Sequence, residues 1–206
     1  MEKPFSPSCE RNRDPILDVL HRHLGGARHV LEIGSGTGQH AVHVAAAMPW
    51  LTWQSSDHIS QHAGIQQWLD EAGLANAPAP IALQAVAQPA PHFTPALAPG
   101  LLPFDAVFTA NTLHIMDWPE VQALFACLPA MLSDQGLVIV YGPFNEGGSF
   151  SSEGNREFEA SLKSRDPRSG IRDIEAVDAL ATGIGLQCID DVAMPANNRM
   201  LVWRRS

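Results

Sequence analysis

The stretch from His29 to Met48, HVLEIGSGTGQHAVHVAAAM, decides the fold of this chain. Its first residues, Val30 to Ile33, have the apolar character of a short buried strand, and residues 39–48 fit a helix. Between them, glycines at every second position predict a tight turn against which a ligand can lie, because glycine has no Cβ atom. The helix after the turn offers free N–H groups at its N-terminus. We therefore expect a strand, turn and helix that form one wall of a binding site.

Strands and helices alternate along the rest of the chain. Further strands are predicted at residues 50–56, 81–86, 104–110, 136–141, 186–194 and 200–203. Further helices are predicted at residues 14–24, 60–71, 119–132, 153–163 and 173–182. Asp14 and Pro15 are expected to begin the first helix and Asp173 to cap the last. Five prolines from residue 88 to residue 103 predict a surface loop. This order predicts an α/β fold: a Rossmann-like, doubly wound, mostly parallel seven-stranded sheet with an antiparallel C-terminal edge hairpin.

The composition narrows the class of protein. The chain has 206 residues, of which 45% are hydrophobic, and a formal net charge of −9. Such a charge, without a block of Lys or Arg, disfavours nucleic acid as a partner. The three cysteines are far apart in the sequence, so neither a disulfide framework nor a metal site is expected. No stretch approaches the roughly 20 apolar residues that cross a bilayer, and we expect a soluble, cytoplasmic protein with no membrane partner.

The spacing of the glycines discriminates between cofactors. A dinucleotide fingerprint requires glycine at position 39, where this chain has Gln39. The pattern Glu-x-Gly-x-Gly-x-Gly resembles instead the first motif of class I methyltransferases. In that family the acidic residue, here Glu32, helps to hold the methionine end of S-adenosylmethionine. The resemblance implies that this cofactor contacts the turn formed by Gly34, Ser35, Gly36, Thr37 and Gly38.

Two later positions extend this cofactor site. Asp57 ends the second strand about 20 residues after the motif, where an acid meets the ribose hydroxyls in such sheets. A carboxylate can accept both hydroxyls of a ribose, although Asp57 could instead cap the helix that follows. At the end of the third strand, where the family commonly has an Asp near the adenine, this chain has Gln84. Gln84 is the expected adenine contact, and its amide is a departure from the family pattern.

The end of the strand at 104–110 supplies the candidate catalytic residues. Asn111 and His114 follow this strand, and carboxyl ends of strands face the ligand crevice in open α/β sheets. We expect Asn111 to contact the cofactor and His114 to act as a base, with Tyr141 in reserve. The alternative is that His114 lies at the start of a helix, where its ring nitrogens have hydrogen-bond partners and no catalytic role. The pairs His40 with His43 and His58 with His62 are expected on solvated helix faces, without a metal.

The resemblance extends to a smaller family along most of the chain. Glu10–Leu17 (ERNRDPIL), Leu31–His40, Asn111–Ile115 (NTLHI), Tyr141–Phe144 (YGPF), the pair 166–167, residues 170–173 and Met194–Asn198 (MPANN) carry it. The chain resembles the methyltransferase-like proteins known as domain of unknown function 938, a family that implies a fold and a cofactor but no acceptor. From these segments we expect Arg11, Asn12, His114, Asn155, Arg172 and Asn198 to contact the acceptor. A helix cap at Asn12, a surface pair at Arg172 and a hairpin turn at Asn198 are the alternatives.

These observations predict an S-adenosylmethionine-dependent methyltransferase. Residues 1–206 are expected to form a single methyltransferase-like domain, with residues 1–25 as an N-terminal helical segment over the cofactor site. The reaction would be in-line methyl transfer to a small-molecule acceptor, by a monomer or a homodimer. A non-catalytic S-adenosylmethionine-binding protein is the alternative. An NAD(P)-dependent oxidoreductase is a weaker one, because of the glycine spacing and because Tyr141, the sole tyrosine, is not part of a Tyr-x-x-x-Lys pair.

Overall fold

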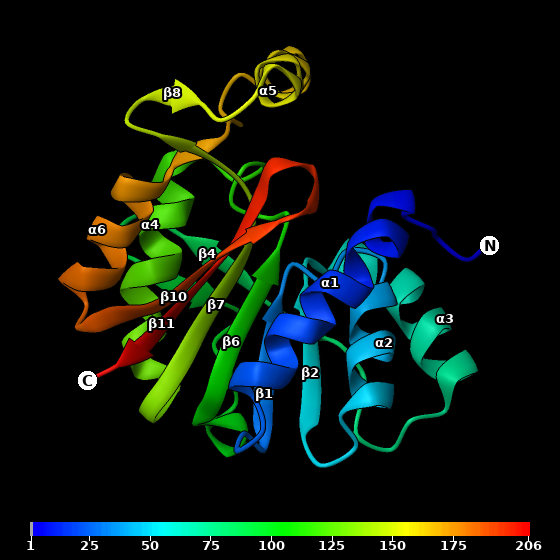
Figure 1. The fold of residues 1–206 in the computed structure, drawn as a ribbon. Helices are drawn as coiled ribbons and strands as arrows, with labels where there is room; N and C mark the ends of the chain where they lie inside the picture. Colours follow the sequence, from blue (N-terminus) through cyan, green and yellow to red (C-terminus); the bar gives the residue numbers. More distant parts are fainter. Residues whose placement is uncertain (1) are drawn as a thin grey trace.

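A central mixed sheet organises the computed structural model, which describes residues 2–206 (Figure 1). Its main strand order is β10-β11-β7-β6-β1-β2-β3, and the two-residue strands β8 and β9 pair with the end of β7. The strands of the main order are β1 (His29–Ile33), β2 (Thr52–Asp57), β3 (Ile81–Ala82), β6 (Phe104–Ala110), β7 (Leu132–Glu146), β10 (Leu186–Met194) and β11 (Asn198–Arg205). Neighbours from β3 to β7 are parallel, whereas β11 is antiparallel to β7 and to β10. The predicted seven-stranded sheet with its antiparallel edge hairpin is confirmed.

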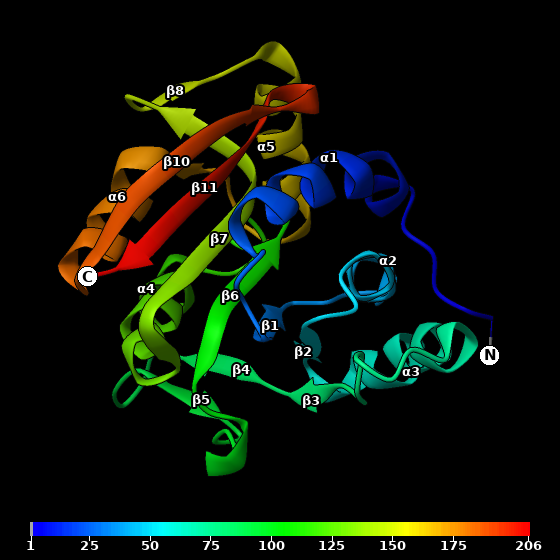
Figure 2. The ribbon, with the colours of Figure 1, turned by 60° about the horizontal axis from the view of Figure 1, so that its bottom comes forward.

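Helices cover both faces of this sheet, as Figures 1 and 2 show. The helices are α1 (Pro7–His23), α2 (Gln39–Ala47), α3 (His62–Ala72), α4 (Trp118–Cys127), α5 (Glu153–Arg165) and α6 (Ile174–Gly183). Helices α1, α2 and α3 lie against one face, and α4 and α6 lie against the other. Helix α5 covers neither face, because it stands beyond the carboxyl ends of the strands, at the top of Figure 1. Within residues 2–206 no helix combines the length and the apolar character that crossing a membrane requires.

The core is divided into two layers by the sheet. Adjacent residues of a strand point to opposite faces, so Val30 joins the cluster under α1 and α2 while Leu31 joins the cluster under α4 and α6. Both clusters contain fully buried large side chains, among them Trp53 on the first side and Trp203 on the second. Burial on both faces explains why β6 and the middle of β7 are nearly continuous runs of apolar residues.

The first helix begins earlier than the sequence predicts. Helix α1 starts at Pro7, with the Ser6 hydroxyl accepting a hydrogen bond from the Cys9 N–H, so the predicted start at Asp14 and Pro15 is wrong. Pro15 lies inside the helix. The buried stripe of α1 continues upstream through Asn12, a polar residue, and the apolar period therefore gave no sign of the first two turns.

Two other predicted elements differ in detail. Only Ile81–Ala82 of the strand predicted at 81–86 joins the main sheet, because β2 ends at Asp57 and offers no further partner. The next residues form β4 (Gln84–Val86), which pairs with β5 (His92–Thr94) inside the proline-rich segment. Asp173 precedes α6 as predicted, but its side chain makes no capping hydrogen bond.

Candidate functional site

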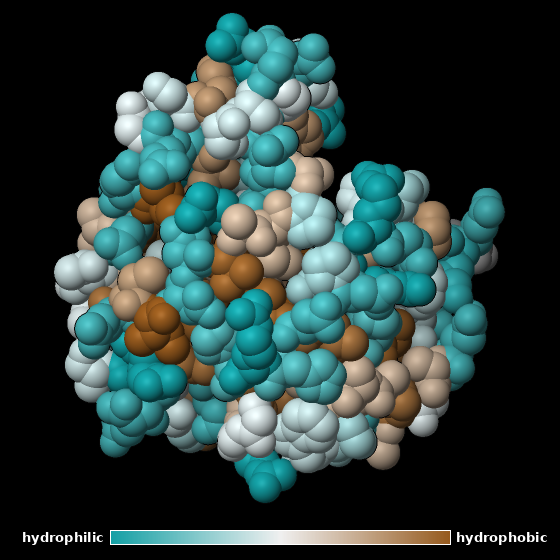
Figure 3. All heavy atoms as spheres, viewed as in Figure 1, coloured by the Kyte–Doolittle hydropathy of each residue, from teal (hydrophilic) through white to brown (hydrophobic). Residues whose placement is uncertain are grey.

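An open cavity of about 1160 Å³ lies at the carboxyl ends of the parallel strands. Pockets for small ligands usually have volumes of about 300–1,000 Å³, so this cavity has room for two ligands side by side. Its walls come from the segment after β1, from the ends of β2, β6 and β7, from helices α1 and α5, and from the turn between β10 and β11. In Figure 3 the surface is notched between the part of the molecule that carries α5 and the part that carries α1.

The glycine turn after β1 is held tightly to its neighbours. The N–H groups of Gly34 and Ser35 both donate to the Ser56 carbonyl at 3.0 Å. Gly34 has φ of +73°, and a Cβ atom there would lie 2.6 Å from Thr112 Oγ1. Gly36 also has a positive φ, of +57°, but a Cβ atom on it would meet nothing within 4 Å, since Gly36 faces the cavity. The turn therefore needs glycine for packing at one position and leaves open space for a ligand at the other.

We expect Gly34→Ala to destabilise the fold far more than Gly36→Ala. A methyl group at Gly34 combines a positive φ with a clash against Thr112, which predicts a loss of about 2–4 kcal/mol in the free energy of unfolding. Gly36→Ala carries only the conformational cost of about 1–2 kcal/mol. Urea unfolding of both variants and of Gly34→Ala/Thr112→Ala measures the difference. Equal losses for the two glycines, or no recovery in the double variant, would contradict this packing argument.

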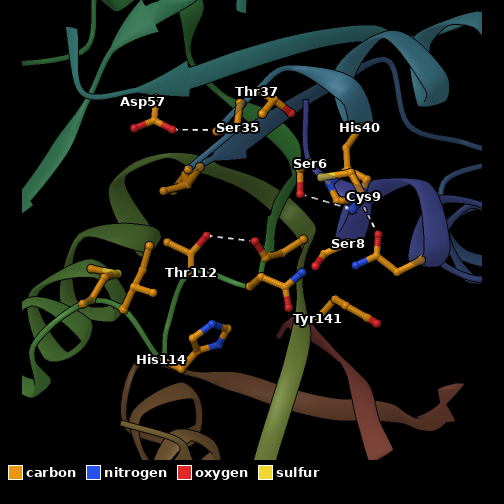
Figure 4. Close-up of a pocket in the computed structure, with 18 of the residues that line it drawn as sticks. Ser6, Ser8, Cys9, Ser35, Thr37, His40, Asp57, Thr112, His114 and Tyr141 are labelled. Atoms are coloured by element: carbon orange, nitrogen blue, oxygen red, sulfur yellow. Dashed lines mark hydrogen bonds between the residues drawn. The ribbon is translucent and has the colours of Figure 1, made fainter. Parts of the chain in front are cut away.

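Asp57 lies at the end of β2 beside the glycine turn, and Figure 4 shows its carboxylate facing that turn. Its Oδ2 accepts the Gly36 N–H at 2.8 Å and its Oδ1 accepts the His58 N–H at 2.7 Å. The predicted alternative, a cap for the next helix, is not what the chain uses: His58 caps the short 3-10 turn Ile59–Gln61, and Gln61 is the N-cap residue of α3. Each carboxylate oxygen has further lone pairs, and Asp57 lines the cavity, so two more donors can be accepted there.

Glu32 lies behind the glycine turn and is 1% exposed. Its Oε2 accepts hydrogen bonds from Trp53 Nε1 at 3.0 Å and from the Ser35 hydroxyl at 2.9 Å. Burial raises the pKa of Glu32 to about 7, although these two hydrogen bonds act in the opposite direction. Glu32 is thus an acid that is half ionised near neutral pH, one residue away from the cavity wall.

The opposite end of the cavity is formed by residues that follow β6 and by β7. His114 and Tyr141 line it, well separated from Asp57 in Figure 4. Burial lowers the pKa of His114 to about 4, with Arg172 and Arg165 adding to the effect, so its imidazole is neutral at pH 7. Burial raises the pKa of Tyr141, which therefore stays protonated and favours the role of hydrogen-bond donor over that of base.

Asn111 has a backbone conformation that its sequence did not reveal. Its φ is +56°, in the left-handed region that residues other than glycine seldom adopt, and its N–H donates to the Tyr141 carbonyl at 2.9 Å. Asn111 lines the cavity and directly follows β6, three residues before His114. Strained backbone at such a position is common in binding and catalytic sites, because it aims a side chain that a relaxed turn would not.

Helix α1 is fastened over the cavity by two residues that follow the glycine motif. Gln39 Oε1 accepts the Ser6 N–H at 2.6 Å, and its Nε2 donates to Glu10 Oε1 at 3.1 Å. His40 Nε2 donates to Asn12 Oδ1 at 2.8 Å. His40 is buried and its pKa is lowered to about 4, first by burial, so the expectation of a solvated face was wrong for this residue.

The contacts of α1 with Gln39 and His40 also place the thiol of Cys9 in the cavity wall. Cys9 lines the cavity and its Sγ lies 3.9 Å from His40 Nδ1. Burial raises the pKa of the Cys9 thiol, so it is protonated at neutral pH. Sequence reasoning missed Cys9, Gln39 and His40 as parts of the site. The one available signal was the position of Gln39 and His40 directly after the glycine motif.

The structure gathers most of the predicted site residues around this one cavity. The lining residues among them are Arg11, Asn12, Gly34, Ser35, Gly36, Thr37, Asp57, Gln84, Asn111, His114, Tyr141, Asn155 and Asn198. Glu32, Gly38 and Arg172 are not lining residues. Gly38 packs against Ile65, and a Cβ atom on Gly38 would lie 3.1 Å from the Cα of Ile65. The Arg172 guanidinium donates to the Leu113 carbonyl at 3.1 Å and to the Met116 carbonyl, so it supports the turn that carries His114.

The other histidines hold local structure. His58 Nδ1 lies 2.8 Å from the Ser60 hydroxyl, and His62 Nε2 donates to the Asp57 carbonyl at 3.2 Å. Among residues 2–206, no three His, Cys, Asp or Glu side chains come together as a set of metal ligands. The cavity presents a carboxylate, amides, an imidazole, a phenol and a thiol to a ligand.

A comparison with protein families matches nearly the whole chain. Residues 3–205 match the family described as "Protein of unknown function (DUF938)". This match agrees with the resemblance that the sequence segments suggested, and it extends over more than half of the chain.

Solved structures share this fold at low sequence identity. An O-methyltransferase family protein from Burkholderia thailandensis superposes with a TM-score of 0.76 at 15% identity, over 97% of this chain and 57% of that one. A putative O-methyltransferase from Nostoc punctiforme gives 0.79 at 16% identity, over 97% and 57%. Human N-acetylserotonin methyltransferase, solved in complex with S-adenosylmethionine, gives 0.74 at 12% identity, over 97% and 53%. The chain thus spans little more than half the length of these structures, and the likeness establishes the fold.

Proposed function

We propose a function from the premise that this chain belongs to the family described as protein of unknown function DUF938. The proposed function is that of an S-adenosylmethionine-dependent methyltransferase, which moves the methyl group in line to a small-molecule acceptor. The observation that carries the proposal is the pairing of Asp57 with Gly36: a carboxylate with free lone pairs at a strand end, bonded to a glycine turn that leaves open space in a large cavity. This pairing suits an adenosyl ligand, because the acid can accept two ribose hydroxyls while the glycine backbone permits close approach.

The residues present fit this cofactor along the length of the cavity. Asp57 would hold the ribose, and Gln84, which lines the cavity beyond Asp57, would offer its amide to the adenine. The turn from Gly34 to Gly38 would pass under the ligand, and Glu32 behind it, in its ionised form, would attract the ammonium group of the methionine part. Residues 1–25 would act as the cover of this site, since α1 is fastened to it through Gln39 and His40.

The chain itself would align the reactants and exclude water. When bound, the cofactor would supply a methyl group on a sulfonium: an oxygen, nitrogen or sulfur atom of the acceptor attacks this carbon in line, and the carbon–sulfur bond breaks as S-adenosylhomocysteine leaves. Asn111 is held at the junction of the cofactor and acceptor parts of the cavity by its strained backbone. His114 is neutral at pH 7 and can accept a hydrogen bond from an acceptor that carries a proton, although its lowered pKa makes it a weak base in the ligand-free protein. Protonated Tyr141 can donate a hydrogen bond to the acceptor.

The activity is tested with S-adenosylmethionine that carries a labelled methyl group. Incubation with a cell extract freed of macromolecules should transfer label to a small molecule in the presence of the wild-type protein, and Asp57→Ala should abolish the transfer. In a parallel incubation with unfractionated extract, label transferred only to protein or nucleic acid would contradict the small-molecule acceptor. Tight binding of the cofactor without any transfer would favour the alternative, a protein that binds S-adenosylmethionine without catalysis.

Cys9 offers an independent test of where the cofactor binds. Cys9 lines the cavity, whereas Cys127 and Cys188 do not, so S-adenosylhomocysteine should slow alkylation of Cys9 by iodoacetamide at least tenfold and leave Cys188 unchanged. Alkylation of each thiol is followed by mass spectrometry of peptides. If the ligand binds but protects none of the three thiols, or protects Cys188 in place of Cys9, the assignment of the cavity fails.

A further inference from the structure

We propose that the methyl acceptor is a small, largely apolar molecule that carries a carboxylate or a similar anionic group, which Arg11 binds at the His114 end of the cavity. The proposal rests on the proposed function, because it assigns the part of the cavity that the cofactor leaves free. Three features carry it: an arginine without an ionic partner, a second positive charge behind the cavity wall, and apolar walls between the two.

Arg11 is the first of these features. In the part of the chain that the structure describes, its guanidinium has no carboxylate within 4 Å, and its side-chain hydrogen bond goes to the Ser8 hydroxyl at 3.1 Å. Its neighbour Glu10 pairs with Arg13 at 2.8 Å and with Gln39, so the nearest acid in the sequence is engaged elsewhere. A guanidinium has five donors in a fork that matches a carboxylate. Arg11 lines the cavity and its charge acts on Tyr141, so it is placed to bind an anion at this end of the cavity.

Arg172 supplies the second positive charge. Its guanidinium is half-buried and donates to the carbonyl oxygens of Leu113, Met116 and Arg168, with no carboxylate within 4 Å among residues 2–206. The partial negative charges of these carbonyl groups do not neutralise the Arg172 guanidinium. Its positive charge therefore acts on His114, which lies in the turn between Leu113 and Met116. The lowered pKa of His114 agrees with this field, after the larger effect of burial.

The acidic groups of the cavity are placed away from this end or are already engaged. Asp57 lies at the other end of the cavity, as Figure 4 shows, and is bonded to Gly36 and His58. Glu120 accepts the Asp117 N–H at 3.0 Å in the capping box of α4. One further acid, Glu159, lies behind the wall, and its charge acts on His114 in the opposite sense to Arg172.

The Glu159 carboxylate is engaged, because it pairs with Lys163 at 2.6 Å and accepts the Ile171 N–H at 2.6 Å. The acids near His114 therefore have partners, whereas Arg11 on the cavity wall has no ionic partner among the described residues and suits an anionic acceptor.

The walls around His114 are apolar and suit a ring. Phe158 packs edge-on against His114 with ring centroids 5.2 Å apart. The neighbouring lining residues are Ile115, Met116, Pro143, Pro195 and Ala196. Ile115 is 57% exposed and lines the cavity, so it offers apolar surface for a ligand to cover. A flat ring with one negative group satisfies both the walls and Arg11.

A carboxylate at Arg11 could also come from the methionine part of the cofactor, and two arms of one experiment separate the sources. In the first, S-adenosylhomocysteine and 5′-methylthioadenosine, which lacks the amino-acid part, are titrated by calorimetry into wild type and Arg11→Gln. We expect Arg11→Gln to change neither affinity by more than twofold. A tenfold loss for S-adenosylhomocysteine alone would assign Arg11 to the cofactor and overturn the proposal.

In the second arm, three probes that share a phenol ring and differ in charge are titrated into the protein saturated with S-adenosylhomocysteine. These are 4-hydroxybenzoate, 4-hydroxybenzyl alcohol and 4-hydroxybenzylamine. The benzoate should bind at least tenfold more tightly than the amine, because charge-assisted hydrogen bonds exceed neutral ones. Arg11→Gln should weaken the benzoate about tenfold and leave the alcohol within twofold. Arg22→Gln is the matched control, an exposed arginine of the same helix that is not a lining residue, and it should change nothing.

Every other outcome decides against the proposal. Equal affinities for the three probes, tighter binding of the amine, or no binding of any of them would show that this end of the cavity does not select an anion. Failure of S-adenosylhomocysteine to bind would count against the proposed function instead. The three probes titrated into the ligand-free cavity would still decide whether Arg11 favours an anion.

Discussion

Replacing Asp57 by alanine is expected to weaken the binding of S-adenosylmethionine by two to three orders of magnitude. Two hydrogen bonds from ribose hydroxyls to a carboxylate contribute about 1.5–3 kcal/mol each, and loss of both corresponds to about 3–4 kcal/mol once their non-additivity is allowed for. Asp57→Asn keeps one acceptor oxygen and should have an intermediate affinity. Calorimetric titration measures all three proteins.

The control for this prediction has to separate binding from support of the turn, because Asp57 also accepts the N–H groups of Gly36 and His58. Asp105 is the matched residue. Its Oδ2 accepts the N–H groups of Arg28 and His29 at 2.8 and 3.0 Å, and it is not a lining residue of the cavity. Asp105→Ala should lower stability about as much as Asp57→Ala and leave cofactor affinity unchanged. Equal affinities for Asp57→Ala and wild type would remove Asp57 from the cofactor site.

Glu32→Gln should stabilise the ligand-free protein at pH 8 and weaken cofactor binding at the same time. Burial raises the pKa of Glu32 from 4.5 to about 7, so the native state binds a proton that the unfolded state has released between these values. The stability that Glu32 contributes is therefore fully present below pH 4.5 and is lost as the pH rises through 7. The difference corresponds to about 3 kcal/mol between the two limits. Glutamine stays neutral and should escape this loss.

The measurement is the free energy of unfolding in urea at pH 4.5 and at pH 8, for wild type, Glu32→Gln and Glu157→Gln. Glu157 is exposed, so Glu157→Gln removes the same charge from a position that is not buried. The advantage of Glu32→Gln over wild type should grow by up to about 3 kcal/mol between the two pH values, whereas that of Glu157→Gln should stay constant. Titration with S-adenosylmethionine at pH 8 should give a weaker affinity for Glu32→Gln. A constant difference across pH would show that Glu32 is not a buried, titrating acid.

Much of the fold could be predicted from the sequence where local pattern and tertiary packing agree. The apolar run before Gly34 and the alternate glycines specify strand β1 and its turn, because both features depend on the backbone alone. Asp57 could be predicted from its distance to the motif, because parallel strands bring their carboxyl ends to the same edge.

The remainder of the site depends on contacts that no local pattern encodes. The early start of α1 was hidden because Asn12, on its buried face, is polar and finds its partner in His40, 28 residues away. The left-handed backbone of Asn111 is compatible with asparagine, but asparagine also occurs in other turns, so the residue type alone did not reveal it. Arg172 was expected to touch the acceptor, but its guanidinium lies behind the turn of His114, and only the course of the chain after α5 could place it there.

The most direct test of the account is calorimetric titration of the wild-type protein with S-adenosylmethionine, beside NAD and NADP. The structure of the cavity predicts micromolar binding of S-adenosylmethionine with one site per chain, no binding of either dinucleotide, and loss of the signal in Asp57→Ala. Failure of S-adenosylmethionine to bind, or preferential binding of NAD or NADP, would contradict the assignment of this cavity to a methyl-donating cofactor.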